Sequence, residues 1–138
     1  MNINQKTGYL TLSSHLEVGP GLSASDLLQT HRHWEEWVSV DSERVSAYRL
    51  IFSLDGETVV GKIYFTAYFL KDSGLMSGWT LSANQFLEKA RSRTKGKLKK
   101  WFVQNCEGAS LPMEEVWGRL SVEYDARNET VFILCQYA

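Results

Sequence analysis

The chain has 138 residues, of which 43% are hydrophobic and 12% aromatic, and its formal net charge at pH 7 is -1. This length suits one folded domain with its own hydrophobic core, and the composition excludes an intrinsically disordered or fibrous chain. No apolar run reaches the ~18–20 residues that a membrane-spanning helix needs, and a net charge near zero gives no general attraction to nucleic acid.

The first third of the chain predicts a strand followed by a helix. Residues 9–12 alternate as in a short strand, and a Gly-Pro-Gly turn follows at 19–21. Ser23 and Asp26 have the spacing of a helix-capping pair. One helical stripe then contains the residues Leu27, Leu28, His31, Trp34 and Val38. We therefore expect a helix over residues 23–39.

The middle of the chain predicts three antiparallel strands. Apolar residues alternate over 48–54 and lead into Asp55-Gly56, a strong signal for a two-residue hairpin turn. The return strand, over 58–70, is rich in aromatic residues. A third strand is expected over 75–81. These three segments predict a meander.

The last part of the chain predicts a long helix and a closing hairpin. Ser82 and Gln85 form a second capping pair, and apolar residues then recur at steps of three and four up to residue 105. Strands are expected over 120–124 and 131–137. The order β-α-βββ-α-ββ predicts an α+β fold over residues 1–138 as a single domain. We expect a mainly antiparallel sheet of about five to six strands, with two helices packed on one face.

The residue types that carry catalysis do not form a recognisable pattern. His31 and His33 would point about 200° apart on the predicted helix and could not hold one metal ion together. The adjacent carboxylates at 35–36 and 114–115 lack a partner group for acid–base chemistry. Nucleophile-elbow, phosphate-loop and dinucleotide-binding motifs are absent from the sequence. The sequence therefore predicts a protein that is not an enzyme, with no catalytic residues, no metal and no cofactor.

The cysteines and the N-terminus predict a compartment. Cys106 and Cys135 lack metal-ligand spacing, and we expect free thiols in the core. The first residues, MNINQKTGYL, lack the charged-then-apolar pattern of a signal peptide. We therefore expect a cytoplasmic protein with no membrane partner.

An acidic segment around two tryptophans is the first candidate for a partner-binding surface. Trp34 belongs to the predicted apolar stripe, whereas Trp37 lies near its edge and could be buried or exposed. If exposed, it would be an aromatic anchor ringed by acids, which suits a basic partner. The candidate acidic face consists of Glu35, Glu36, Trp37, Asp41 and Glu43.

A basic segment is the second candidate. Seven of the 15 Lys and Arg residues lie between 89 and 100, so the rest of the chain carries an excess of acids. One ridge of the predicted basic helix contains Lys89, Arg93, Lys97 and Lys100. This ridge could be an ordinary solvated face, a docking surface for an acidic protein, or a set of phosphate contacts. Trp101 and Phe102 fall on the apolar side and are not interleaved as base-stacking platforms.

Two stretches resemble a known class of protein. The opening GYLTLSSHLEVGPGLSASDLL and the ending VWGRLSVEYDARNETVFILCQY are similar to those of small bacterial immunity proteins, including the partners of contact-dependent growth-inhibition toxins. The resemblance implies a non-catalytic cytoplasmic protein that neutralises a cognate toxin domain by tight 1:1 binding. A nuclease is one candidate for that toxin, and a basic nuclease would favour docking on the acidic face. A nucleic-acid-binding module that uses the basic helix is the alternative.

Overall fold

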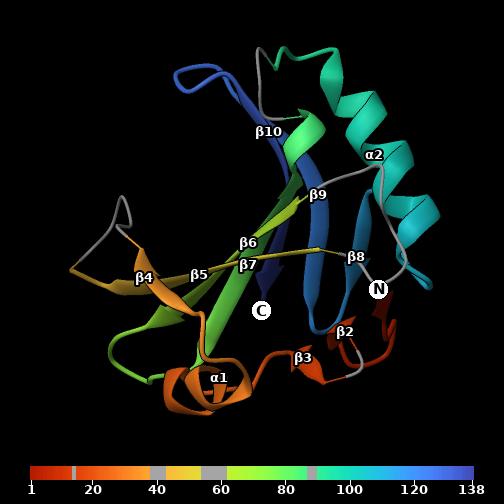
Figure 1. Ribbon diagram of the computed structural model, residues 1–138. Coiled ribbons are helices and arrows are strands. Elements are labelled where there is room, and N and C mark those ends of the chain that lie inside the picture. Colours follow the sequence, from red (N-terminus) through yellow and green to blue (C-terminus); the bar gives the residue numbers. More distant parts are fainter. Residues whose placement is uncertain (14, 38–42, 54–61, 87–89) are drawn as a thin grey trace.

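The computed structural model describes residues 1–13, 15–37, 43–53, 62–86 and 90–138. Within these ranges the chain forms a larger and a smaller antiparallel sheet together with two α-helices (Figure 1). The predicted α+β fold class is confirmed.

The larger sheet contains the two strand groups that the sequence predicted. Its strands are β4 (Glu35–Trp37), β5 (Val45–Ser53), β6 (Lys62–Leu70), β7 (Met76–Ala83), β8 (Met113–Glu115), β9 (Gly118–Asp125) and β10 (Thr130–Tyr137). Over the described ranges these seven strands have the order β4-β5-β6-β7-β10-β9-β8, and every neighbouring pair is antiparallel. Because β7 pairs with β10, the meander and the closing hairpin join at the middle of the sheet. The count exceeds the expected five to six strands because β4 and β8 extend the two edges.

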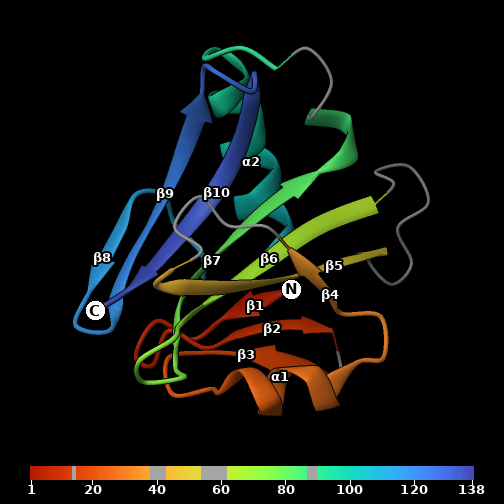
Figure 2. The same cartoon turned by 90° about the vertical axis from the view of Figure 1, so that its left-hand side faces the viewer.

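The remaining elements are a small sheet and the helices. The small sheet has the order β1-β2-β3 and consists of β1 (Asn2–Ile3), β2 (Leu10–Ser13) and β3 (Leu16–Val18). The helices are α1 (Ala24–Thr30), a short 3-10 turn (Asn84–Phe86) and α2 (Thr94–Asn105). Ser23 caps α1 by accepting a hydrogen bond from the Asp26 backbone N–H at 3.2 Å, as the capping pair predicted. In Figure 2 the larger sheet is seen with α2 behind it and the small sheet below.

One face of the larger sheet forms the hydrophobic core. Side chains alternate between the two faces of a strand, so Trp79 of β7 and Cys135 of β10 both point inward and are buried. Phe102 of α2 packs against Trp79 with ring centroids 6.4 Å apart, and Trp34 packs edge-on against Phe65 at 6.1 Å. Both α2 and the N-terminal third therefore cover the same face. Within the described residues the other face stays uncovered.

The predicted helix over residues 23–39 is wrong beyond residue 30. His31 follows α1 with an extended backbone, and Glu35–Trp37 is the edge strand β4. Trp34 is buried against the sheet, with its indole N–H donating to Thr30 Oγ1 at 3.1 Å. The backbone groups after Trp34 then pair with β5 rather than within a helix.

The predicted helix over residues 82–105 is wrong in its first half. Ser82 belongs to β7, where its hydroxyl donates to the Val131 carbonyl at 2.9 Å and links β7 to β10 instead of capping a helix. The α-helix begins at Thr94. The hairpin turn predicted at Asp55-Gly56 lies outside the described residues, although the flanking strands β5 and β6 pair as expected.

Candidate functional site

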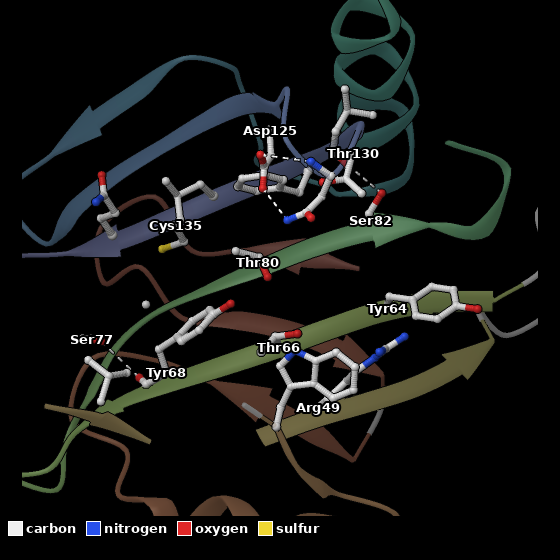
Figure 3. A pocket seen from close by; sticks show the side chains of 18 of the residues that line it. Arg49, Tyr64, Thr66, Tyr68, Ser77, Thr80, Ser82, Asp125, Thr130 and Cys135 are labelled. Atoms are coloured by element: carbon white, nitrogen blue, oxygen red, sulfur yellow. Dashed lines mark hydrogen bonds between the residues drawn. The ribbon is translucent and has the colours of Figure 1, made fainter. Parts of the chain in front are cut away.

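The uncovered face of the larger sheet is hollowed into a groove. Its volume is about 900 Å³, and its walls come from β4, β5, β6, β7, β10 and the β9–β10 turn. Arg49, Thr66, Thr80 and Leu134 form one row of cross-strand neighbours on this face. Figure 3 shows the side chains of these strands from the open side. We call this surface the groove.

One end of the groove is built by three stacked side chains from adjacent strands. The guanidinium carbon of Arg49 lies 4.2 Å from the ring centroid of Trp37 and 4.7 Å from that of Tyr64. Trp37 pairs with Ala47 and Tyr64 pairs with Ile51, so the two rings flank Arg49 diagonally. We call Trp37, Arg49 and Tyr64 the Arg49 stack.

The Arg49 stack has the chemistry of an interface rather than of a core. Trp37 keeps 44% of its surface exposed, and Arg49 and Tyr64 are only half-buried. Stacking on aromatic faces stabilises a guanidinium while its N–H donors stay in the plane between the rings. Within the described residues no ion pair joins Arg49 to an acid. Within the part of the chain that the structure describes, the donors of Arg49 thus have no acidic partner.

The floor and the far end of the groove are largely neutral. Thr66 and Thr80 supply hydroxyls at the centre, and Phe132 and Leu134 add apolar surface. At the far end, Asp125 accepts hydrogen bonds from its own turn: from the backbone N–H of residue 127 at 3.0 Å and from the Asn128 side chain at 2.8 Å. Apolar surface with a few polar groups is typical of binding sites.

The structure divides the predicted acidic face. Glu35 and Trp37 point to the groove side of β4, whereas Glu36 points to the opposite side, because successive residues alternate in a strand. Glu43 is exposed before β5, and Asp41 lies outside the described residues. Trp37 is exposed, and its ring contacts the guanidinium of Arg49. The sequence did not single out Arg49 or Tyr64, although a charged residue within the alternating run 48–54 was a usable signal.

The predicted basic helix lies on the other side of the sheet from the groove. Lys97 and Lys100 are exposed on α2, Arg93 is its N-cap residue, and Lys89 lies outside the described residues. Since α2 covers the core face of β9 and β10, the two candidate surfaces face away from each other (Figure 1). They are therefore separate hypotheses.

The ionisable groups with perturbed pKa values in the described chain belong to the core. Burial raises the pKa of Cys106 and of Cys135 from 9.0 to about 12, and both thiols are free, as predicted. Burial also raises the pKa of Tyr137, whose hydroxyl donates to the Gly8 carbonyl and accepts from Trp79. Groups this strongly protonated do not act as nucleophiles near neutral pH.

The histidines differ from their predicted arrangement. Because α1 ends at Thr30, His31 and His33 follow the helix, both exposed, with ring centroids 5.2 Å apart. The described residues contain no group of three or more His, Cys, Asp or Glu side chains that could hold a metal ion. Among the helices of these residues, none has the length and apolar character needed to cross a membrane.

Comparisons with known proteins place the chain in a family. A family profile described as the RhsI1 immunity protein matches residues 1–138. A chain of the solved structure "Rhs1-CT in complex with cognate immunity protein RhsI1" is similar over 99% of this chain and 86% of that one, with 25% identity and a TM-score of 0.80. A search of curated proteins found no match. Both findings name Rhs proteins rather than contact-dependent growth inhibition. The chain belongs to the RhsI1 immunity protein family.

Proposed function

We propose that this protein is the cytoplasmic, non-catalytic immunity partner of an Rhs C-terminal toxin domain, which it neutralises by direct 1:1 binding. The observation that carries the proposal is the family match over the whole chain. The similar solved chain belongs to a complex between an Rhs1 C-terminal domain and its cognate immunity protein, which supports the same partner class here. Whether that toxin is a nuclease is a separate question for assay.

We propose the groove as the docking surface. Trp, Tyr and Arg are the residue types most enriched among those that dominate binding energy, and the Arg49 stack contains one of each. Trp37 is large and 44% exposed, so a partner that covers it would bury much additional apolar surface. The acidic face around Glu35, Glu36 and Glu43 is the competing surface, and it suits a basic toxin.

A titration of toxin activity separates binding from catalysis. The toxin domain encoded beside this chain is mixed with increasing amounts of the purified protein, and its residual activity is measured. A stoichiometric inhibitor gives a linear fall that ends at a molar ratio of one. Complete inhibition at a small fraction of that ratio would show that the protein acts catalytically on the toxin. Full activity at excess immunity protein would contradict the proposal.

Nucleic-acid binding through α2 is the second candidate. It is supported by the exposed Lys97 and Lys100 and by the absence of an acidic residue within Thr94–Asn105. Fluorescence anisotropy with DNA and RNA at two salt concentrations tests it, because phosphate contacts make affinity fall steeply with salt. Binding weaker than ~10⁻⁴ M, or binding that salt does not change, excludes this use of α2.

A further inference from the structure

We propose that Arg49 binds a carboxylate side chain of the toxin domain, held between the rings of Trp37 and Tyr64. The inference rests on the proposed function and names the chemical groups that meet in the interface. The centre of the interface would contain a cation of this chain and an acid of the partner. Docking on the acidic face would instead bring acids of this chain against basic groups of the partner.

The geometry of the Arg49 stack selects a planar anion. Two aromatic rings from the neighbouring strands contact the guanidinium, with ring centroids at 4.2 Å and 4.7 Å from its carbon. The remaining donors lie in the guanidinium plane, where a carboxylate accepts two parallel hydrogen bonds. Stacking also restricts the side chain before binding, so less conformational entropy is lost when the partner arrives.

Among the described residues, the charges around the groove include no acid that neutralises Arg49. Of the described residues that line it, Arg49 is the one basic side chain, and the one acid, Asp125, is hydrogen-bonded within its own turn. Glu35 is the cross-strand neighbour of Arg49 on β4, yet the two form no ion pair within the described chain. A carboxylate from a partner would meet this cation in a partly desolvated site, where a charge pair is stronger than at an open surface.

The first experiment is isothermal titration calorimetry of the toxin domain with variants at position 49. Arg49→Ala should weaken binding by about 100-fold, because it leaves the partner's carboxylate buried and unpaired. Arg49→Lys keeps the charge but not the planar fork, and it should still weaken binding by about 10-fold. Arg91→Ala removes an exposed arginine that does not line the groove and serves as the matched control, with unchanged affinity expected. Thermal unfolding confirms that each variant is folded.

The direction in which Glu35→Gln changes the affinity shows whether the toxin presents an acid to Arg49 or basic groups to the acidic face. If an acid of the toxin reaches Arg49, Glu35 repels it, and Glu35→Gln should tighten binding by about two- to fivefold. If instead a basic toxin docks on the acidic face, the same substitution should weaken binding. Glu36→Gln, on the opposite side of β4, is the control and should change affinity less.

A double-mutant cycle identifies the partner group. Each Asp and Glu of the toxin domain is replaced by its amide and titrated against the wild-type protein and against Arg49→Ala. One of these replacements should weaken binding to the wild-type protein about as much as Arg49→Ala does. The same replacement should not weaken binding to Arg49→Ala any further. The inference is overturned if no toxin acid couples to Arg49, or if Arg49→Ala binds like the wild type. Wild-type protein that releases no binding heat and gives no protection would overturn the proposed function itself.

Discussion

A single hydroxyl joins three distant parts of the chain. Tyr137 Oη donates to the Gly8 carbonyl at 2.9 Å and accepts the indole N–H of Trp79 at 3.1 Å, so it links β10, the N-terminal turn and the centre of β7. Trp79 is fully buried. Replacing the hydroxyl of Tyr137 would leave the buried N–H of Trp79 without this acceptor.

Tyr137→Phe should therefore lower the free energy of unfolding by about 1–3 kcal/mol, the cost of leaving a buried donor unpaired. Chemical denaturation measures the change. Tyr124→Phe is the matched control, because Tyr124 makes no hydrogen bond through its hydroxyl within the described residues, and it should shift stability by less than about 0.5 kcal/mol. Equal effects of the two substitutions would show that the hydroxyl bridge contributes nothing.

Two glycines predict opposite responses to the same substitution. A Cβ at Gly78 would clash with the carbonyl oxygen of Cys135 on the adjacent strand, so Gly78→Ala should destabilise the fold by about 1–3 kcal/mol. A Cβ at Gly96, within α2, meets nothing within 4 Å. Gly96→Ala should stabilise the protein by about 0.5–1 kcal/mol through helix propensity. Thermal melting of both variants checks the pair, and a stable Gly78→Ala would contradict the close pairing of β7 with β10.

The raised thiol pKa values predict a loss of stability in alkali. The pKa of Cys106 is raised from 9.0 to about 12, so the folded state holds the proton when the unfolded state has released it. Its contribution to stability is complete below pH 9 and is lost as the pH rises from about 9 to 12. Each such thiol lowers the free energy of unfolding by up to about 1.4 kcal/mol per pH unit in that window. Denaturation at pH 7, 9 and 10.5 should show the wild type losing stability faster than Cys106→Ala, and parallel curves would refute the assignment.

At the scale of elements, local patterns predicted strands better than helices. The alternation over 48–54 and the closing hairpin were read correctly because period-two burial is a local property of the sequence. The stripe from Leu27 to Val38 satisfied the helical period, yet residues 35–37 pair with β5 instead. That choice depends on Arg49, Tyr48 and Ala47 being present on a neighbouring strand, which no local pattern reveals.

The same limit applies to the candidate site. Trp37 was identified from the sequence as a possible anchor that could be buried or exposed, and the structure leaves it exposed. Its contacts were not predictable, because the Arg49 stack needs the β4–β5 and β5–β6 registers together. A change of one residue in either register would move a ring to the opposite face of the sheet.

Helix α2 provides an element-scale prediction. Its apolar side, including Leu98, packs in the core, while Lys97 and Lys100 face solvent on the side of the molecule away from the groove. Lys97→Glu with Lys100→Glu should therefore leave the toxin affinity within about twofold of the wild type, since rim or remote charges change binding little. Calorimetry at 150 mM salt measures it. An affinity that falls 10-fold or more would indicate that the toxin binds at α2.

At the scale of the whole molecule, one face of the larger sheet forms the core and the other carries the proposed docking surface. Its inner face and α2 form the core, and its outer face carries the exposed Trp37 beside Arg49 and Tyr64. Figure 3 shows Arg49 and Tyr64 on this face. Side chains on strands hold their geometry better than those on loops, which favours a preorganised docking surface. We accordingly expect the partner to dock on the outer face.

The most direct test is a nuclear magnetic resonance titration of ¹⁵N-labelled protein with the unlabelled toxin domain. The indole N–H signal of Trp37 and the backbone amides of Arg49 and Tyr64 should shift or broaden at equimolar toxin. The amides of Lys97 and Lys100 should stay in place. Changes confined to α2, with the Trp37 indole signal unmoved, would contradict docking at the groove.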